Sequence, residues 1–164
     1  MKLFGITGWK NSGKTGLVER LVAYFTNDGL RVSTIKHAHH AFDVDTPGRD
    51  SHRHRTAGAH EVLVSSRHRL ALMRELRGAP EPTLPELVEH LGPADLVLIE
   101  GFKREPHAKI ECHRVATGQP LIALQDPTIC AIASDSSPDA PVPVLDLDDT
   151  AAIAAFICQH HGLT

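Results

Sequence analysis

A phosphate-binding loop signature close to the start of the sequence constrains this chain more than any other feature. Residues 8–15 read Gly-Trp-Lys-Asn-Ser-Gly-Lys-Thr, which matches the pattern G-x-x-x-x-G-K-[ST]. Gly8 and Gly13 allow backbone dihedral angles that a Cβ atom would forbid, so successive N–H groups can turn towards an anion. Lys14 supplies a positive charge for the β- and γ-phosphates, and the Thr15 hydroxyl is a ligand for Mg²⁺. The motif therefore predicts a nucleotide-binding chain.

The residues on either side of this loop predict a strand before it and a helix after it. Residues 2–7 are typical of a short buried strand, and apolar residues recur at helical spacing from Lys14 to Phe25. The amino terminus of that helix would point at the phosphates. After a helix stop at Gly29, the β-branched residues 30–36 predict a second strand. This βαβ order indicates an α/β fold with a mainly parallel sheet flanked by helices.

The rest of the chain predicts further strands and helices in a mixed order. Strands are expected at residues 61–65, 69–76, 94–99, 110–115, 121–124 and 129–133, and longer helices at residues 84–91 and 150–160. Residues 69–76 fit a helix nearly as well as a strand. A short helix capped by Asp50 or Ser51 is expected to run towards Gly58, and residues 134–143 are expected to form a loop.

Length, charge and cysteine content exclude several classes of protein. A chain of 164 residues is expected to form one domain, over residues 1–164. The formal net charge is -3 and there is no basic tail, which argues against bulk nucleic-acid binding. No apolar run approaches the roughly twenty residues that span a membrane. The three cysteines form no CxxC pair, which favours a reducing compartment, so we expect a cytoplasmic protein.

Three carboxylates are candidates to ligate the metal ion or to position a water at the γ-phosphate. Glu100 follows the apolar segment 94–99 directly, where a carboxylate is expected to hold Mg²⁺ opposite Thr15. Aspartate is the usual residue there, and the alternative is an ordinary carboxylate in solvent. Asp45 and Asp50 lie in a long polar connection that is expected to cross the γ-phosphate, where each would ligate the metal or position a water. The alternative is that both only form turns.

Two further residues are candidates for contact with the nucleotide, and a group of histidines is a candidate for metal. His37 ends the second predicted strand, which places it near the nucleotide. Asp135 follows a late apolar strand, where an aspartate can accept hydrogen bonds from the N1–H and amine of guanine; a turn-forming aspartate is the alternative. The chain has 12 histidines, including His39 and His40. Neighbouring histidines on an extended segment point to opposite faces, so their spacing does not diagnose a metal site.

Several motifs occur in a fixed order along nearly the whole chain. They are Gly8-x-x-x-Ser12-Gly13-Lys14-Thr15, Ile35-Lys36-His37, Asp43-x-Asp45-x-Pro47-Gly48-x-Asp50-Ser51 with Arg53 and Ala57-Gly58-Ala59, Leu98-Ile99-Glu100-Gly101-Phe102-Lys103, Lys109-Ile110-Glu111 and Ala133-Ser134-Asp135. With these motifs the chain resembles the family of the molybdopterin-guanine dinucleotide biosynthesis accessory protein B, a group of small GTP-binding proteins.

This resemblance implies a P-loop NTPase fold, with extra strands late in the chain, and a homodimer. It also implies that the chain binds GTP with Mg²⁺, hydrolyses GTP slowly, and assists the molybdopterin guanylyltransferase that joins GMP to molybdopterin. Molybdopterin and molybdoenzymes are further candidate partners, and neither nucleic acid nor a membrane is expected.

The resemblance also implies the residues of the site. Gly8, Ser12, Gly13, Lys14 and Thr15 would hold the phosphates, and Glu100, with Asp45, would serve the magnesium. Together with the interpretation of the individual residues above, the residues expected for the nucleotide are Gly8, Trp9, Lys10, Asn11, Ser12, Gly13, Lys14, Thr15, Gly16, His37 and Asp135; those for magnesium are Thr15, Glu100 and Asp45; and those for catalysis are Lys14, Asp45 and Glu100. Some dimeric relatives carry a lysine directly after the first glycine that reaches the partner subunit. Here Lys10 is one place later, so that role is in doubt, and Gly16 replaces a common second threonine.

Two functions from other classes remain as alternatives. A small-molecule kinase fits a phosphate loop on a chain of this length, but it needs a mobile lid with arginines, for which only residues 37–55 are available. A nucleotide-dependent metallochaperone fits the histidines and predicts metal that survives chelator washing and is lost when His39 and His40 are changed to alanine. A catalytic cysteine is not expected, because Cys112 lies in the middle of a predicted strand.

Overall fold

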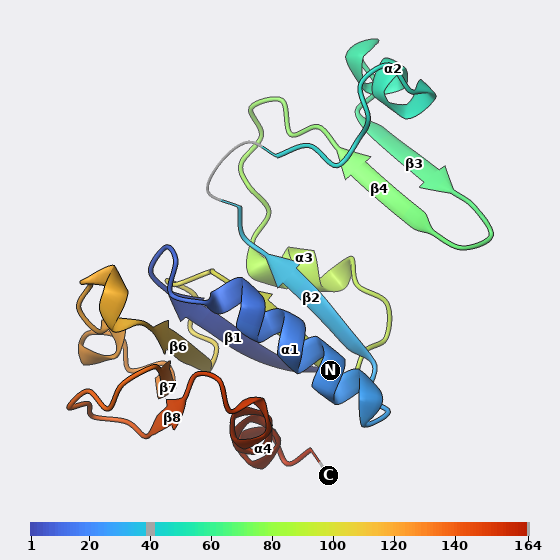
Figure 1. The fold of residues 1–164 in the computed structure, drawn as a ribbon. Coiled ribbons are helices and arrows are strands. Elements are labelled where there is room, and N and C mark those ends of the chain that lie inside the picture. The colour runs from blue at the N-terminus through green and yellow to red at the C-terminus, as the bar shows by residue number, and fades with distance from the viewer. Residues whose placement is uncertain (39–41, 164) are drawn as a thin grey trace. The chain divides into compact units, whose positions relative to one another are not determined.

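The computed structural model describes residues 1–38 and 42–163, and these form two compact units (Figure 1). Unit 1 comprises Met1–His37 and Leu84–Thr164, and unit 2 comprises Ala38–Thr83. The prediction of one domain over residues 1–164 stays a prediction. No helix among the described residues has the length and apolar character needed to cross a membrane.

Unit 1 is built on a six-stranded sheet in the order β2-β5-β1-β6-β7-β8, and every pairing in it is parallel. The strands are β1 (Lys2–Gly8), β2 (Val32–Lys36), β5 (Leu96–Glu100), β6 (Lys109–His113), β7 (Ile129–Ser134) and β8 (Val144–Asp146). The predicted α/β architecture is therefore confirmed. Because all six strands run in the same direction, their carboxyl ends lie at one edge of the sheet.

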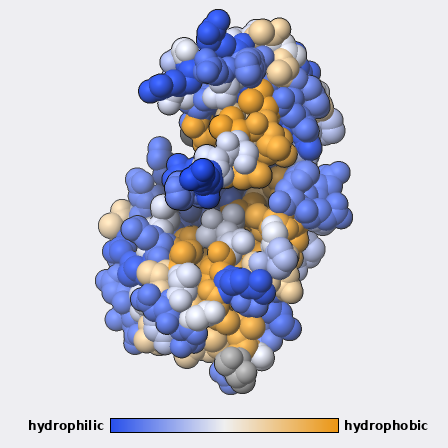
Figure 2. All heavy atoms as spheres, turned by 90° about the vertical axis from the view of Figure 1, so that its right-hand side faces the viewer, coloured by the Kyte–Doolittle hydropathy of each residue, from blue (hydrophilic) through white to orange (hydrophobic). Residues whose placement is uncertain are grey.

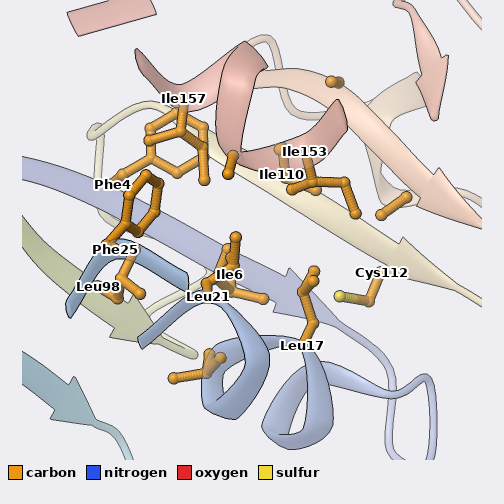
Figure 3. Packing of buried hydrophobic residues seen from close by; sticks show 14 of the residues in the cluster. Phe4, Ile6, Leu17, Leu21, Phe25, Leu98, Ile110, Cys112, Ile153 and Ile157 are labelled. Carbon is orange, nitrogen blue, oxygen red and sulfur yellow. The ribbon is translucent and has the colours of Figure 1, made fainter. Parts of the chain in front are cut away.

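Helices cover both faces of this sheet. The helices of unit 1 are α1 (Lys14–Asn27), α3 (Leu84–Glu89) and α4 (Thr150–His161), with two short 3-10 turns, η1 (Val115–Thr117) and η2 (Ile122–Leu124). On one face α1 and α4 pack against β1, β5 and β6, as the labelled side chains in Figure 3 show. On the other face α3 packs against β2 and β5.

The central strand β5 explains why the sequence shows a continuous apolar run there. Leu96 and Leu98 belong to the core beneath α1 and α4, whereas Val97 and Ile99 belong to the core beneath α3. All four side chains are 0% exposed. A strand buried on both faces cannot alternate polar with apolar residues, so its whole length is apolar until Glu100.

Unit 2 consists of helix α2 (Asp50–Thr56) and an antiparallel hairpin of β3 (Glu61–Ser65) and β4 (Leu70–Arg74). Among the described residues of this unit, Val62 is the one buried hydrophobic side chain. Leu63, Leu70 and Leu72 are exposed, and Figure 2 shows hydrophobic side chains on the surface of this unit. Apolar burial therefore contributes little to its stability.

A partly buried arginine, Arg55, organises unit 2 in place of an apolar core. The Arg55 guanidinium binds the carboxylates of Asp43 at 2.9 Å, Asp45 at 3.1 Å and Glu75 at 2.6 Å. The hydrogen bonds that Arg55 donates to these three carboxylates, that to Asp43 foremost, raise the pKa of Arg55 further above its usual range. Three carboxylates converging on one guanidinium tie the start of the unit, helix α2 and the end of β4 together.

Most predicted elements are confirmed, and the exceptions have local causes. The prediction of a strand at residues 121–124 is wrong, because Ile122–Leu124 form η2. The N–H groups of Ile122 and Ala123 donate to the Glu111 carboxylate and so favour this turn. Strand β8 was not predicted, since only three residues of it pair. The N-cap of α2 is Arg49 rather than Asp50 or Ser51. The C-cap of α1 is Asp28, one residue before the predicted helix stop at Gly29.

One partly buried histidine in unit 1, His107, has two buried ring nitrogens. His107 lies in the loop between β5 and β6, and a Cβ atom added at Gly5 of β1 would lie 2.5 Å from its Nε2. Among the described residues, neither ring nitrogen has a hydrogen-bond partner. Burial first, and then the positive charge of Lys109, lower the pKa of His107 to about 4, against an opposing effect of Asp126. The folded chain therefore holds this ring neutral.

The pH dependence of unfolding should report this histidine. Its folded pKa, about 4, lies below the ordinary value of 6.5. The unfolded state therefore takes up the proton first, and the free energy of unfolding should fall by at most about 3 kcal/mol as pH falls through this window. His107→Phe, which keeps a ring of similar shape, should flatten this dependence in urea unfolding. The control His90→Phe, at an exposed histidine, should leave it unchanged. An identical slope in both variants would contradict the assignment.

Candidate nucleotide-binding site

The candidate site lies at the carboxyl edge of the unit 1 sheet. The loop between β1 and α1 leaves this edge beside the ends of β5 and β6, because Ile6 is in register with Glu100 and Gly8 with Cys112. The predicted order of strand, glycine-rich loop and helix is confirmed. Figure 1 shows α1 continuing directly from this loop. Three connections that are distant in sequence therefore meet at the phosphate loop.

The backbone of the loop requires its two glycines. Gly8 has φ +141° and Gly13 has φ +95°, both outside the range that other residues adopt easily. A Cβ atom at Gly8 would also overlap the carbonyl oxygen of Cys112 and the hydroxyl of Ser12. The Ser12 hydroxyl is buried and has no hydrogen-bond partner within the described parts of the chain, residues 1–38 and 42–163. A loop of this shape offers backbone N–H groups and one unsatisfied hydroxyl to an anion.

Thr15 and Glu100 meet at the start of α1. The Thr15 hydroxyl donates a hydrogen bond to Glu100 Oε1 over 2.8 Å, and the Lys36 Nζ lies 3.4 Å from the same oxygen. Glu100 is only 8% exposed, so these two partners supply polar contacts that water cannot make there. A hydroxyl and a carboxylate side by side are the hard oxygen ligands that Mg²⁺ prefers. The donor set therefore fits magnesium.

The Lys14 ammonium is folded back onto its own loop. Its Nζ donates to the carbonyl oxygen of Trp9 over 2.6 Å. Burial lowers the pKa of Lys14, with a smaller contribution from Lys36 in the same direction, while Cys112 and Glu100 oppose the shift. A partly desolvated cation that holds a single neutral carbonyl has much to gain from a phosphate oxygen.

The remaining loop residues differ in what they contact. Trp9 donates from Nε1 to the carbonyl oxygen of Pro120 over 2.8 Å, and the Lys103 ammonium lies 4.2 Å from the centre of its ring. Lys10 and Asn11 are exposed, and Asn11 has φ +64°. Gly16 lies in the first turn of α1. Trp9 is therefore the loop residue that joins the phosphate loop to other parts of unit 1.

Glu111 is a residue of this region that the motifs did not assign. It lies on β6 and is 0% exposed, and its two carboxylate oxygens accept the N–H groups of Ile122 and Ala123, each over 2.9 Å. These bonds fix η2 and with it Pro120, the partner of Trp9. In the sequence Glu111 belongs to the motif Lys109-Ile110-Glu111, which names no partner for its carboxylate.

His37 and Asp135 lie where their strands end, as predicted. The His37 N–H donates to the carbonyl oxygen of Glu100 over 2.9 Å, and its ring lies 4.7 Å from that of Phe102. The Asp135 carboxylate accepts the N–H of Val115 over 3.0 Å and lies 3.8 Å from the Arg114 guanidinium. A cavity of about 220 Å³ lies beside it, lined by Ser134, Asp135, Ser136, Ser137, Val144, Leu145 and Asp146. The nucleotide contacts of both residues stay predictions.

Asp45 belongs to unit 2 and has partners there. Its carboxylate accepts hydrogen bonds from Ser51 Oγ over 2.8 Å, the Thr46 N–H over 3.0 Å and Arg55 over 3.1 Å. The structure thus brings Thr15 and Glu100 together, while it gives Asp45 a place in the Arg55 cluster. Its role at the metal stays a prediction.

The histidines and cysteines show no further centre in the described part of the chain. His39 and His40 lie outside the described residues. Across residues 1–38 and 42–163, no group of three or more His, Cys, Asp or Glu side chains is placed to hold a metal. Burial raises the pKa of the Cys112 thiol to about 12, as expected for an inert buried cysteine.

Comparisons with known proteins agree with this architecture. The model of the family described as molybdopterin guanine dinucleotide synthesis protein B matches residues 3–135. The chain is 38% identical over 160 residues to the molybdopterin-guanine dinucleotide biosynthesis adapter protein of Escherichia coli (strain K12), covering 96% of this chain and 91% of that protein. It is 39% identical over 158 residues to the adapter protein of the same description from Haemophilus influenzae, covering 94% and 86%.

A solved structure extends the agreement to the fold. The crystal structure of a molybdopterin-guanine biosynthesis protein B superposes with a TM-score of 0.76 at 26% identity, covering 96% of this chain and 97% of that chain. With the six-stranded parallel sheet, this match confirms the predicted P-loop NTPase fold.

The Glu111 carboxylate should stabilise unit 1 and position Trp9. In Glu111→Gln the side-chain NH₂ would face one backbone N–H group and leave it unsatisfied. The free energy of unfolding should therefore fall by about 1–3 kcal/mol. The fluorescence of Trp9, the single tryptophan, should change as well. The matched control is Glu89→Gln on the exposed face of α3, which should change neither quantity. If both variants match the unchanged protein, Glu111 does not hold η2.

Proposed function

The chain belongs to the molybdopterin guanine dinucleotide synthesis protein B family and serves molybdopterin-guanine dinucleotide biosynthesis as an adapter, and we propose that it does so by binding GTP with Mg²⁺. The proposal includes slow hydrolysis of GTP. It also includes assistance to the molybdopterin guanylyltransferase that joins GMP to molybdopterin. The same proposal implies a cytoplasmic homodimer, with molybdopterin and molybdoenzymes as further candidate partners.

The observation that carries the nucleotide proposal is the pair formed by Thr15 and Glu100. These residues are 85 positions apart, yet their oxygens lie 2.8 Å from each other where the phosphate loop meets the end of β5. In P-loop proteins the metal is held between a loop hydroxyl and a strand-end carboxylate, and it bridges the β- and γ-phosphates. Thr15 and Glu100 would hold Mg²⁺ here, and the ion would neutralise charge on those phosphates.

The chain's own residues supply the rest of the binding. The N–H groups of the loop and the Ser12 hydroxyl would hold the phosphates, and the Lys14 ammonium would exchange the Trp9 carbonyl for a phosphate oxygen. Asp135 would accept hydrogen bonds from the N1–H and the amine of guanine, after releasing its present bond from the Val115 N–H. GTP is therefore the proposed nucleotide.

The states of the carboxylates support slow rather than rapid hydrolysis. Glu100 accepts a hydrogen bond from Thr15 and pairs with Lys36, and Asp45 is bound by Arg55. Burial raises the pKa of the Asp45 carboxyl, but hydrogen bonds from Ser51, Thr46 and Arg55 together lower it below its usual value, and a carboxylate with a lowered pKa is a weak general base. Binding rather than turnover is accordingly the proposed basis of the adapter role.

The first test is calorimetric titration of GTP and ATP, each with Mg²⁺. Tight binding of GTP and weak binding of ATP are expected. Lys14→Ala should abolish binding, and Glu100→Gln should weaken it and reduce its dependence on Mg²⁺. The control is Lys2→Ala, which removes the same charge at the opposite end of β1. A preference for ATP would overturn the guanine proposal and favour a kinase, and equal binding by the Lys14 and Lys2 variants would overturn the site.

The adapter role has a separate test. With GTP or molybdopterin limiting, addition of the protein should raise the output of molybdopterin guanylyltransferase, and the Lys14→Ala variant should raise it less. The formation of the guanine dinucleotide cofactor is the quantity to measure. An output that does not respond to the protein would remove the support for assistance to the guanylyltransferase, whatever the calorimetry shows.

A further inference from the structure

Besides the loop's own lysines, Lys103 from another part of the chain lies at the phosphate loop. The phosphate-loop motif assigns no role to it. Lys103 follows Glu100 by three residues, in the loop that leaves β5. Its Nζ lies 4.2 Å from the centre of the Trp9 ring. A cation over an indole face is attracted by the ring electrons, but this attraction is modest compared with an ion pair. The ring therefore holds the ammonium at the loop without neutralising its charge.

The backbone around Lys103 is bent and fixed. Gly101 has φ +94° and Phe102 has φ +47°, a conformation that is costly for a side chain as large as phenylalanine. The Gly101 N–H donates to the carbonyl oxygen of Ile6, over 3.1 Å, which ties this turn to β1. The turn directs Lys103 back towards the phosphate loop.

The buried Lys109 binds backbone carbonyl oxygens of the loop that contains Lys103. Lys109 is 0% exposed, and its Nζ donates to the carbonyl oxygen of Glu105 over 2.6 Å and to the Thr128 hydroxyl over 2.5 Å. The carbonyl oxygen of Lys103 itself lies 3.5 Å from the same Nζ. The position of Lys103 is therefore built into the fold rather than left to a free surface side chain.

The electrostatics of the two cations favour an anion between them. Burial lowers the pKa of Lys103, and the charge of Lys14 lowers it further, while Glu111 opposes the shift. The Lys14 Nζ in turn donates to the carbonyl oxygen of Trp9. Two ammonium groups that contact one tryptophan thus repel each other in the protein without nucleotide. A phosphate oxygen that reached both would remove this repulsion.

We propose that Lys103 binds the terminal phosphate of the nucleotide within the same chain, beside Lys14, and so favours the triphosphate over the diphosphate. The inference rests on the proposed binding of GTP. The terminal phosphate is its proposed partner because Lys103 follows by three residues the strand-end Glu100, which with Thr15 would hold the Mg²⁺ of a bound triphosphate. Arg104, the next residue, is exposed, and its charge serves as the control for that of Lys103.

The test compares GTP with GDP by calorimetry, each with Mg²⁺. Lys103→Met keeps the apolar stem and removes the charge. It should raise the dissociation constant for GTP by about 10- to 100-fold, as for loss of a charge-assisted hydrogen bond, and that for GDP by less than about threefold. Lys103→Arg should restore most of the preference for GTP. Arg104→Met removes the same charge from the neighbouring position and should change neither constant.

The fluorescence of Trp9 supplies a second readout that does not depend on affinity. Because the chain has one tryptophan, the emission comes from Trp9 and responds to its surroundings, which include the Lys103 ammonium over the ring. At saturation, GTP should change the emission more than GDP does, since only the terminal phosphate draws the ammonium from the ring. In Lys103→Met the two saturated spectra should coincide.

The outcomes separate this inference from the function on which it rests. No binding of GTP by the unchanged protein would overturn the proposed function. Normal GTP binding that is abolished by Lys14→Ala but unaffected by Lys103→Met would overturn only the role of Lys103. Equal weakening of GTP and GDP would do the same, because it indicates that Lys103 only supports the loop. If Lys103→Met does not fold, as judged by circular dichroism, Lys103→Gln carries the same comparison.

Discussion

The parallel alignment of the unit 1 strands is the constraint on which the rest of the site depends. It brings the carboxyl ends of β1 and β5 to the same edge of the sheet, with Ile6 in register with Glu100. Only then can the Thr15 hydroxyl, at the start of α1, reach a carboxylate 85 residues away. The alignment is in turn stabilised by apolar cores on both faces, because a parallel sheet must be covered on each side.

A single strand, β6, fixes the two loops beside the phosphate loop through two buried charges. Lys109 binds carbonyl oxygens of the loop after β5, and Glu111 binds N–H groups of η2. Both side chains are 0% exposed, so each depends on these bonds to offset its desolvation. Both loops also reach Trp9, one through Lys103 and the other through Pro120. The two buried charges therefore fix the positions of these two loops.

Unit 2 is organised by a different interaction. Its hairpin leaves Leu63, Leu70 and Leu72 exposed. In place of an apolar core, Arg55 forms ion pairs with three carboxylates. A unit held by ion pairs is more sensitive to salt and less rigid than one held by apolar packing. Asp45 is part of this cluster, so any role for it at a metal would compete with its bonds to Arg55.

The sequence by itself determined the phosphate loop, the βαβ start and the doubly buried strand β5, because each depends on residues that are close together in the chain. It also pointed to Glu100, whose place at a strand end is visible in the apolar run. It could not supply the partners of Lys103, Glu111 or Asp135, and it misjudged residues 121–124. Only the tertiary structure decided those contacts. The period of a sequence reports which face of an element is buried, whereas the order and register of strands, set by the whole chain, decide which side chains meet.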